Sequence, residues 1–419
     1  MSGRMDASSL ACPLQEASER LAMAAAEELG LPIDFTHEQI AFATRSIADL
    51  PPGLDTRAAG EPLPVLAISL PANTEGAMAA YLIAKARSRG WAVRARLSRR
   101  ASRIAGVLAE VFAADDNVDF ACGDGESFIL TALADPAVAL LQVFGDASWM
   151  RGYQAHVERA GKVLAFEGSG KDPLLVLEGT DLDEAVRISL DSGLFAGGAA
   201  CMSAERFLVH DSLADAFVER LVACLADVTP APPDRPGTRL GFLYSEAAAR
   251  RAASQVVEAI SRGARMRLGG LPRQVEWRGR TFHAFGPVVL TDVPRDADVL
   301  ASETFAPVFP IRTFSAIDEA IEEALGTPYG LSATVVGPTE LARRAAKRLG
   351  DGHANVYCNA SMAEAFKPEH WACGGFGLSG WTWGPGPDRQ IIERHGRRSF
   401  RALLDDTACA FRATRGAGQ

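Results

Sequence analysis

VLAISL, at residues 65–70, is a mostly apolar run with the length and composition of a buried strand. Residues 75–89 follow it with a helical pattern, and WAV at residues 91–93 begins another strand. Strands that alternate with helices of this length predict a largely parallel sheet with helices packed on its faces. This stretch therefore predicts an α/β fold.

The same alternation continues toward the C-terminus. Further apolar runs predict strands at residues 139–143, 163–166, 174–177 and 206–210. Thr180 followed by Asp183 predicts the N-terminal cap of a helix that ends near Gly193. The pattern restarts after Lys171, so we expect two α/β units whose boundary lies near Glu167. Crevices between such units are where ligand sites usually lie.

Composition excludes several classes of protein. The chain has 419 residues, of which 48% are hydrophobic, so it is long enough for two domains. Its net charge of −9 argues against a general nucleic-acid or anionic-membrane binder. It has neither an apolar run of membrane-spanning length nor a signal-peptide pattern at residues 1–13, so we expect a cytoplasmic protein. The seven cysteines and seven histidines form no C-x-x-C or H-E-x-x-H motif, so neither a disulfide framework nor a metal site is expected.

One cysteine stands in an unusual setting. Cys201 ends the small-residue run AGGAA at residues 196–200, where a substrate carbonyl and a flat cofactor can come close to its thiol. EGSGK at residues 167–171 lies upstream, and its glutamate is suited to activating water against a thioester. Taken alone, a cysteine among alanines and glycines is most often an inert core residue, and Glu167 alone would read as a solvated carboxylate at a strand end. Together the two motifs indicate covalent catalysis on an aldehyde.

Several motifs, in this order, resemble the aldehyde dehydrogenase superfamily. The resemblance covers roughly residues 63–380, and the interval of 34 residues between Glu167 and Cys201 is the one found in that family. The remaining matches are SETFAPV at residues 302–308, YGL at residues 329–331, Asn359, and GGFGLSG at residues 374–380. The resemblance implies an aldehyde-dehydrogenase-like fold of two doubly wound α/β domains.

The resemblance also implies a domain division. Residues 1–166 would form the Rossmann-like cofactor domain, of which residues 1–62 are a shortened helical part without the family's oligomerisation hairpin. Residues 167–380 would form the catalytic domain. The tail at residues 381–419 departs from the family pattern, and we expect it to make oligomer contacts in a homodimer.

Roles carry over residue by residue. Cys201 is implied as the nucleophile, which forms a thiohemiacetal and, after hydride transfer, a thioester. Glu167 is implied as the general base for the water that hydrolyses the thioester. Asn73 stands at the oxyanion position, where its amide and the backbone N–H of Cys201 would stabilise the oxyanion. Glu303 would hold the nicotinamide ribose, and Phe305 would pack near the ring.

The predicted cofactor is NADP in preference to NAD. In the family segment that handles the adenosine ribose, Arg96 takes the lysine place, Ser98 lies between, and Arg99 takes the glutamate place. A guanidinium in place of a carboxylate adds a partner for a 2′-phosphate. In the alternative interpretation these arginines belong to a basic helix start that faces water.

Other positions depart from the family pattern. Near the pyrophosphate, Phe144, Gly145 and Asp146 replace the usual Thr-Gly-Ser, and an aspartate there would repel phosphate unless it is turned away or paired. Alanine also replaces family side chains before Asn73 and before the nucleophile, at Ala72, Ala196 and Ala199.

The leading hypothesis is an NAD(P)-dependent aldehyde dehydrogenase that oxidises a small or aromatic aldehyde to its acid. One alternative is an acyl-thioester or acyl-phosphate reductase that runs the same chemistry backward, although Glu167 is less needed there. A second alternative is a non-catalytic member of the family that binds a ligand without turning it over. The joint presence of Cys201, Glu167, Glu303 and Asn73 argues against this second alternative.

Overall fold

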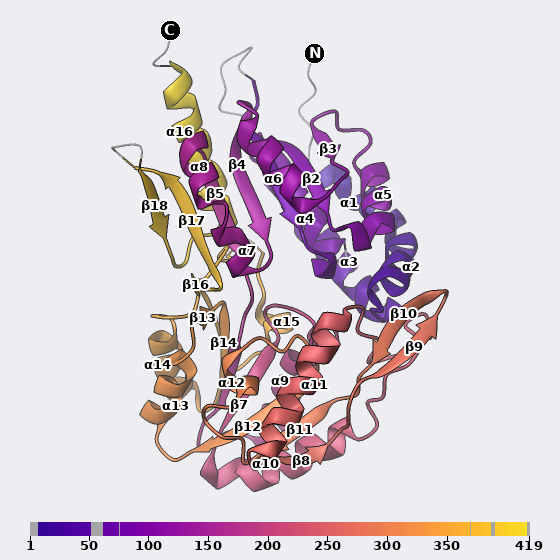
Figure 1. Ribbon diagram of the computed structural model, residues 1–419, viewed down its shortest axis with the longest axis vertical. Helices are drawn as coiled ribbons and strands as arrows, with labels where there is room; N and C mark the ends of the chain where they lie inside the picture. The colour runs from indigo at the N-terminus through magenta and orange to yellow at the C-terminus, as the bar shows by residue number, and fades with distance from the viewer. Residues whose placement is uncertain (1–6, 52–61, 75, 369, 387–389, 417–419) are drawn as a thin grey trace.

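Two β-sheets, one above the other in Figure 1, organise the part of the chain that the computed structural model describes. The described residues are 7–51, 62–74, 76–368, 370–386 and 390–416. Among them, strands form two seven-stranded sheets and two two-stranded ribbons. The predicted α/β class is confirmed.

The first sheet has the strand order β18-β17-β5-β4-β1-β2-β3. Its strands are β18 (Ile391–Arg394), β17 (Gly380–Pro385), β5 (Val163–Glu167), β4 (Val138–Phe144), β1 (Val65–Leu70), β2 (Ala92–Leu97) and β3 (Val118–Phe120). The five strands from β5 to β3 are parallel to one another, whereas β17 is antiparallel to both of its neighbours, β5 and β18. From β1 the chain builds β2 and β3 on one side and then β4 and β5 on the other. The carboxyl ends of β1 and β4 therefore flank a switch in strand order, where open α/β sheets bind ligands.

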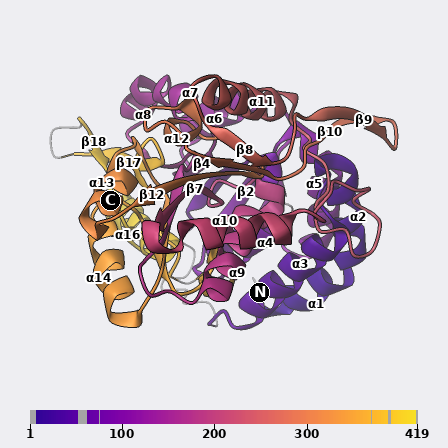
Figure 2. The ribbon, with the colours of Figure 1, turned by 90° about the horizontal axis from the view of Figure 1, so that it is seen from below.

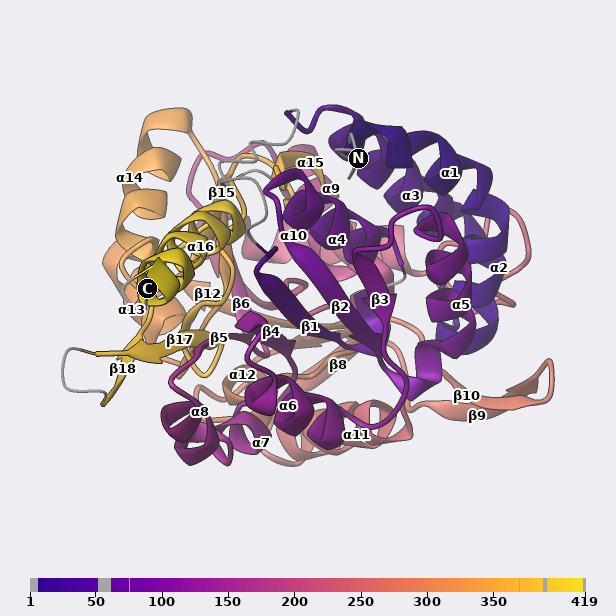
Figure 3. The same cartoon turned by 90° about the horizontal axis from the view of Figure 1, so that it is seen from above.

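Side-chain alternation in β1 explains why both faces of the first sheet are covered. Leu66 and Ile68 are buried in the cluster that contains α4 (Ala77–Ser88) and α5 (Ser102–Val111), whereas Ala67 is buried against α6 (Gly125–Ala134). Successive residues of a strand point to opposite faces, so an apolar run such as VLAISL requires a helix layer on each side. Figure 3 shows β1 and β2 between α4 and α6.

The second sheet has the order β15-β14-β6-β7-β12-β11-β8, and only β8 is antiparallel to its neighbour. Its strands are β15 (Asn355–Cys358), β14 (Ser332–Val336), β6 (Asp172–Val176), β7 (Ala204–His210), β12 (Val308–Phe314), β11 (Val288–Thr291) and β8 (Arg265–Leu268). Leu174 faces the side of α9 (Leu182–Gly193) and α10 (Asp211–Leu225), and Leu175 faces the side of α13 (Ile317–Leu325) and α14 (Thr339–Leu349). Figure 2 shows α10 on one side of these strands and α11 (Glu246–Ser261) on the other.

Shorter elements complete the described chain. The ribbons pair β9 (Arg273–Trp277) with β10 (Arg280–Ala284) and β13 (Tyr329–Gly330) with β16 (Phe376–Gly377). The remaining helices are η1 (Ala7–Leu10), α1 (Ala11–Glu16), α2 (Ser18–Leu29), α3 (Ile33–Ala48), η2 (Ala72–Thr74), η3 (Arg99–Ala101), α7 (Ala147–Arg151), α8 (Gln154–Ala160), η4 (Phe195–Gly198), α12 (Asp298–Ala301), α15 (Met362–Ala365) and α16 (Phe400–Gly416). No helix among the described residues combines the length and the apolar character that crossing a membrane requires.

The predicted cap at Thr180 is wrong by one residue. The Thr180 hydroxyl donates to the carbonyl oxygens of Leu177 (2.5 Å) and Val336 (3.1 Å), so it ties the end of β6 to β14. Asp181 caps α9 instead, because its carboxylate accepts the backbone N–H of Glu184 at 3.0 Å.

Several element boundaries also differ from prediction. The strand expected at 91–93 is β2 and extends to Leu97, and the strand expected at 174–177 is β6, which begins two residues earlier. The helix expected at 75–89 is α4, and residue 75 lies outside the described residues. In the tail, β17 and β18 join the first sheet and α16 packs against α4 and β4, while residues 387–389 and 417–419 are outside the described chain. The division at residues 166 and 380 stays a prediction.

A buried carboxylate attaches the N-terminal helices to the first sheet. Glu28, at the end of α2, is fully buried and accepts bonds from the Ser102 hydroxyl (3.0 Å) and the backbone N–H groups of Arg103 (3.0 Å) and Ile104 (3.3 Å). These groups belong to the first turn of α5, whose own N-cap residue, Ala101, provides no side-chain acceptor. Glu28 therefore caps α5 from a different helix.

Replacing Glu28 by alanine is expected to lower the free energy of unfolding by about 2–4 kcal/mol, because several buried donors lose their acceptor. Urea unfolding followed by circular dichroism measures the change. Glu19→Ala, on an exposed position of the same helix, is the matched control and should change stability by less than about 0.5 kcal/mol. Equal effects of the two substitutions would contradict the capping role.

Candidate active site

Close backbone packing determines where Cys201 lies. The residue follows η4 and a turn in which Gly198 has a φ of 74°. A Cβ on Gly198 would lie 2.6 Å from the backbone nitrogen of Pro307, and a Cβ on Gly170 would overlap the carbonyl oxygen of Cys201. Only glycine fits at these two positions. Gly170 and Gly198 therefore allow the segments around residues 170, 201 and 307 to pack closely around the thiol.

Cys201, Glu167 and Asn73 line one cavity of about 330 Å³, which we call the thiol cavity. Cys201 comes from the loop after η4, Glu167 from the end of β5, and Asn73 from η2 after β1. The walls are completed mainly by apolar side chains, among them Phe42, Met78, Phe195, Met202, Phe366 and Trp371. The three residues that the resemblance singled out for the reaction are thus brought together from different segments.

Glu167 is a buried carboxylate with one backbone donor. It is 3% exposed, and its Oε2 accepts the N–H of Gly374 at 2.8 Å. Burial raises its pKa to about 8, the Gly374 N–H opposes the rise, and the charge of Asp172 adds to it. A carboxyl group whose pKa lies near 8 exchanges a proton readily at slightly alkaline pH, as a general base requires.

The Cys201 thiol is half-buried at the wall of the thiol cavity. Burial raises the pKa of the thiol well above its ordinary value, and the carboxylates of Glu167, Glu303 and Asp172 raise it further. In the protein alone the sulfur is therefore protonated at neutral pH, and forming the thiolate requires a compensating positive charge nearby.

Glu303 and Phe305 are positioned by a buried ion pair. Lys171 Nζ contacts Glu205 at 2.8 Å, and the Glu205 carboxylate accepts the backbone N–H groups of Thr304 (2.7 Å) and Phe305 (2.6 Å). Phe305 consequently holds a φ of 59°, which is unusual outside glycine. This arrangement fixes the segment that carries Glu303.

The Glu303 carboxylate itself lies next to the EGSGK motif. The Ser169 hydroxyl donates to its Oε2 at 2.9 Å, and Arg251 lies 3.9 Å away. Burial raises the pKa of Glu303 to about 7, and the nearby charge of Glu205 acts in the same direction. The hydrogen bond joins the two motifs that flank Cys201.

A second cavity of about 500 Å³ lies at the switch in strand order, and we call it the switch-point cavity. Arg96, Ser98 and Arg100 line it, together with the aromatic side chains of Trp149 and Tyr244. Two guanidinium groups, a hydroxyl and exposed ring faces are the groups that bind the phosphates, ribose and base of a nucleotide.

The two cavities adjoin each other. Pro71 and Phe144 line both, so one extended ligand can occupy the switch-point cavity and reach Cys201 in the thiol cavity. The residues present therefore fit a dinucleotide, whose phosphates the two arginines would hold.

Not every predicted cofactor residue lines the switch-point cavity. Arg96 and Ser98 do, whereas Arg99 is exposed, 3.6 Å from Asp124, and is not among the lining residues. Arg100, for which the sequence predicted no cofactor role, is among the lining residues. Gly145 is not among the lining residues either, and its N–H donates to the Glu167 carbonyl at 3.1 Å.

The aspartate of the altered pyrophosphate segment is paired. Asp146 caps α7 by accepting the backbone N–H groups of Ser148 (2.9 Å) and Trp149 (3.1 Å), and the Ser148 hydroxyl also donates to it. The Ser148 hydroxyl and these N–H groups lower the pKa of Asp146 despite partial burial. The carboxylate is therefore ionised, and these three hydrogen bonds all go to its Oδ1 atom.

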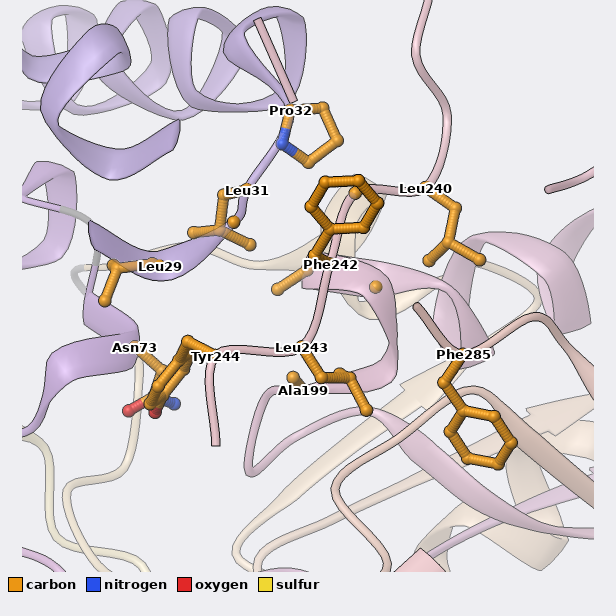
Figure 4. Close-up of a pocket in the computed structure, with 14 residues that line it drawn as sticks. Leu29, Leu31, Pro32, Asn73, Ala199, Leu240, Phe242, Leu243, Tyr244 and Phe285 are labelled. Carbon is orange, nitrogen blue, oxygen red and sulfur yellow. The ribbon is translucent and has the colours of Figure 1, made fainter. Parts of the chain in front are cut away.

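Alanines replace family side chains in a packed region behind Asn73. Ala196 and Ala199 line a small apolar cavity of about 20 Å³, together with Asn73 and Tyr244 (Figure 4). Ala72, the third departure, lines the switch-point cavity. The volume is close to that of a single water, so the chain fills most of the space behind Asn73 with other side chains.

Lys171, Glu205, Tyr244 and Trp149 were missed from the sequence. Lys171 ends the EGSGK motif and Glu205 lies four residues after Cys201, so charged residues in or next to these segments were the available signal. Tyr244 and Trp149 carry no such signal, because only the fold places them at the switch-point cavity. In the described ranges, no group of three or more histidine, cysteine, aspartate or glutamate side chains is placed to hold a metal ion.

The fold and the site define an α/β protein with a cysteine-containing cavity beside the ligand-binding edge of a Rossmann-like sheet. A family model, the aldehyde dehydrogenase family, matches residues 8–390, and the chain belongs to this family.

Curated relatives agree with this membership. The chain is 33% identical over 359 residues to the 3,6-anhydro-alpha-L-galactose dehydrogenase of Streptomyces coelicolor, a match that covers 82% of this chain and 71% of that protein. It is 37% identical over 224 residues to the succinate-semialdehyde dehydrogenase [NADP(+)] of Deinococcus radiodurans, which covers 52% and 45%. A match to the NADP(+) succinate-semialdehyde dehydrogenase of Mycolicibacterium paratuberculosis covers 41% of that protein. A match to a peroxisomal aminoaldehyde dehydrogenase of Pisum sativum covers 60% of that protein.

Solved structures share the fold. The lactaldehyde dehydrogenase of Escherichia coli superposes with a TM-score of 0.78 at 24% identity, covering 96% of this chain and 83% of that one. An NAD-dependent aldehyde dehydrogenase from Sinorhizobium meliloti gives a TM-score of 0.78 at 26% identity and covers 93% and 80%.

Proposed function

We propose that this protein oxidises an aldehyde to the carboxylic acid, with NAD(P) as the hydride acceptor. Membership of the aldehyde dehydrogenase family supports aldehyde oxidation as the reaction. The observation that carries the proposal is that Cys201, Glu167 and Asn73 line one cavity, which adjoins a nucleotide-sized cavity.

In the first step the Cys201 thiol releases its proton to solvent, its sulfur forms a bond to the carbonyl carbon, and the carbonyl π electrons move to oxygen. The Asn73 amide and the backbone N–H of Cys201 would donate to this oxygen. Donors of this kind stabilise the charged transition state by roughly 3–4 kcal/mol each. When bound, oxidised nicotinamide brings a positive charge that favours the thiolate and accepts the hydride with its two electrons.

In the second step the thioester left on Cys201 is hydrolysed. Glu167 takes a proton from water, the water oxygen attacks the acyl carbon, and the carbon–sulfur bond breaks to release the acid and the thiolate. Because burial raises the pKa of Glu167 to about 8, its ionised form and the hydrolysis rate should increase as pH rises through this value.

The same placement bears on the two alternatives. A reductase acting on acyl thioesters or acyl phosphates must protect its thioester from water, so a glutamate in the thiol cavity argues against it. A non-catalytic binding protein has no need for a carboxylate with a raised pKa beside a thiol. Oxidation followed by hydrolysis uses both groups.

An assay for reduced nucleotide and for carboxylic acid tests the proposed function. Purified protein with NADP or NAD and a panel of aldehydes should produce the two products in a one-to-one ratio. Nucleotide reduction without acid release would leave the protein in an acylated state and contradict the hydrolytic step. No reduction with any aldehyde, despite nucleotide binding, would favour the non-catalytic alternative.

We further propose that NADP is preferred over NAD. Arg96 and Arg100 line the switch-point cavity, and Arg99 stands beside it on η3. A 2′-phosphate on the adenosine ribose would meet these guanidinium groups, whereas the 2′-hydroxyl of NAD offers them no charge. The capped carboxylate of Asp146 lines the same cavity and opposes every phosphate of a bound nucleotide, so the preference depends on the guanidinium groups outweighing this repulsion at the 2′-phosphate.

Replacing Arg100 by alanine is expected to weaken NADP binding about 10- to 100-fold and NAD binding less than about threefold, because one charge-assisted bond is lost. Arg99→Glu should act in the same direction through its charge. Quenching of tryptophan fluorescence during nucleotide titration measures both affinities. Arg103→Ala, an exposed arginine paired with Glu27 outside the cavity, is the control. Equal loss for both nucleotides would contradict 2′-phosphate recognition.

We also propose a cytoplasmic homodimer, as the sequence suggested. The described part of the tail places β18 at the edge of the first sheet, where its outer backbone groups face away from β17. An open sheet edge can pair with a second copy of the chain. Sedimentation velocity of the purified chain measures the oligomeric state, and a monomer would contradict the proposal.

A further inference from the structure

The thiol cavity has apolar walls between its reacting groups and solvent. Phe42 comes from α3, Met78 from α4, Phe195 from η4, and Phe366 and Trp371 from the segment after α15. The cavity volume of about 330 Å³ lies at the lower end of the range for small-molecule sites, which begins near 300 Å³. A small ligand in this cavity is therefore largely enclosed by carbon and sulfur.

Charged groups gather only at the two ends. Cys201 and Glu167 form the reacting end. Glu38 and Arg45 are exposed side chains on α3, so they lie where the cavity opens to solvent. Among the described lining residues no other side chain carries a formal charge, and the middle of the cavity offers no ionic partner to a ligand.

Aromatic rings give these walls flat surfaces. The rings of Phe144 and Trp371 are nearly parallel, with 7° between their planes and 6.3 Å between their centroids. The rings of Phe42 and Phe366 lie 6.1 Å apart. Ring–ring packing holds these side chains in place, and their exposed faces and edges favour another ring or a branched hydrocarbon over a polar group.

We propose that the thiol cavity selects aldehydes with an apolar body, aromatic or branched aliphatic, and discriminates against polyhydroxylated aldehydes and short semialdehydes that carry a carboxylate. The proposal rests on the proposed function for the reaction itself. Among the described lining residues away from the reacting end, Gln39 and Tyr81 are the polar uncharged side chains. A hydroxyl held elsewhere in the cavity loses its water without gaining a partner, and a carboxylate there loses far more. The names of the curated relatives refer to sugar-derived, hydroxylated and carboxylated aldehydes, so this chain would differ from them in substrate class.

A substrate series tests the selectivity. The value of kcat/KM should be about 10- to 100-fold higher for benzaldehyde than for lactaldehyde, and at least about 100-fold higher than for succinate semialdehyde. Among straight-chain alkanals, each methylene buried in the cavity should raise kcat/KM about three- to fourfold until the cavity is filled. Equal or higher values for lactaldehyde or succinate semialdehyde would overturn the proposal while leaving aldehyde oxidation established.

A second measurement separates cavity selectivity from catalysis. Benzamide and lactamide are unreactive, uncharged analogues of an aromatic and a hydroxylated substrate. Benzamide should slow the alkylation of Cys201 by iodoacetamide, read by peptide mass spectrometry, and lactamide at the same concentration should not. If no aldehyde is oxidised but benzamide still protects Cys201, the proposed function fails and the cavity assignment stands. Protection by lactamide alone would overturn the cavity assignment.

A charge placed in the wall should change the preference. Met78→Arg supplies a partner for a substrate carboxylate, so it should raise the ratio of kcat/KM for succinate semialdehyde over benzaldehyde by at least about tenfold. Met266→Arg, the same substitution at a methionine that is 45% exposed on β8 and outside this cavity, should leave the ratio within about twofold. An unchanged ratio in a folded Met78→Arg protein would argue against the assigned wall.

Discussion

Replacing Cys201 by alanine is expected to lower kcat/KM for aldehyde oxidation by at least about 10⁴-fold, since a nucleophile that forms the covalent intermediate has no substitute in the cavity. Steady-state formation of reduced nucleotide measures the loss. The variant should still bind NADP with an affinity within about threefold of the unmodified protein, because the arginines of the switch-point cavity are untouched.

Cys224→Ala is the matched control, because Cys224 is an exposed free cysteine on α10 away from the thiol cavity. It should retain activity within about twofold. Alkylation offers an independent check. Since burial and three carboxylates raise the pKa of the Cys201 thiol, its reaction with iodoacetamide should be slow at neutral pH and faster in the presence of NADP. Activity that survives in Cys201→Ala would remove this residue from the mechanism.

Replacing Glu167 by glutamine should lower steady-state turnover about 10²- to 10⁴-fold through the loss of a general base. The first turnover should persist, because attack by Cys201 and hydride transfer precede the hydrolytic step. Rapid mixing is therefore expected to show a burst of about one reduced nucleotide per active site. Intact-protein mass spectrometry should then detect the acyl group on Cys201.

The pH profile distinguishes the role of Glu167 from a structural one. The raised pKa means that the carboxyl is mainly protonated at neutral pH and ionises as pH rises through about 8, so hydrolysis should increase over that interval. Glu167→Gln should abolish this increase. Glu178→Gln, at an exposed glutamate after β6, should keep the profile of the unmodified protein. A burst lost as completely as steady-state turnover would place Glu167 in the acylation step instead.

Local patterns in the sequence were sufficient for the fold class and for the central strands. VLAISL predicted β1 because a run buried on both faces of a sheet is apolar at successive positions, and the structure covers both faces with helices. The cap of α9 was placed one residue early, since Thr180 and Asp181 are both good cap residues. The choice between them depends on β14, whose carbonyl at Val336 takes the Thr180 hydroxyl.

In the candidate site, too, some residues were predicted from the sequence and others were placed only by the structure. Cys201, Glu167 and Asn73 were named from their motifs, and the structure brings all three to the thiol cavity. Arg99 was assigned to the cofactor from its position in a segment, whereas the lining of the switch-point cavity includes Arg100. Adjacent residues at a turn point in different directions, and the direction is determined by the packing of η3, which a linear pattern does not contain.

By itself the sequence determined the family and the α/β class, and it predicted the reacting groups, because these depend on residue types at fixed intervals and on local periodicity. Only the tertiary structure decided which charges are buried and which side chains line the thiol cavity. Glu28 caps a helix 74 residues away, Lys171 pairs with Glu205 across two strands, and α3 contributes a wall to the cavity that Cys201 lines. Such contacts form between residues distant in sequence, and the burial that they produce shifts the pKa values of Glu167 and Cys201.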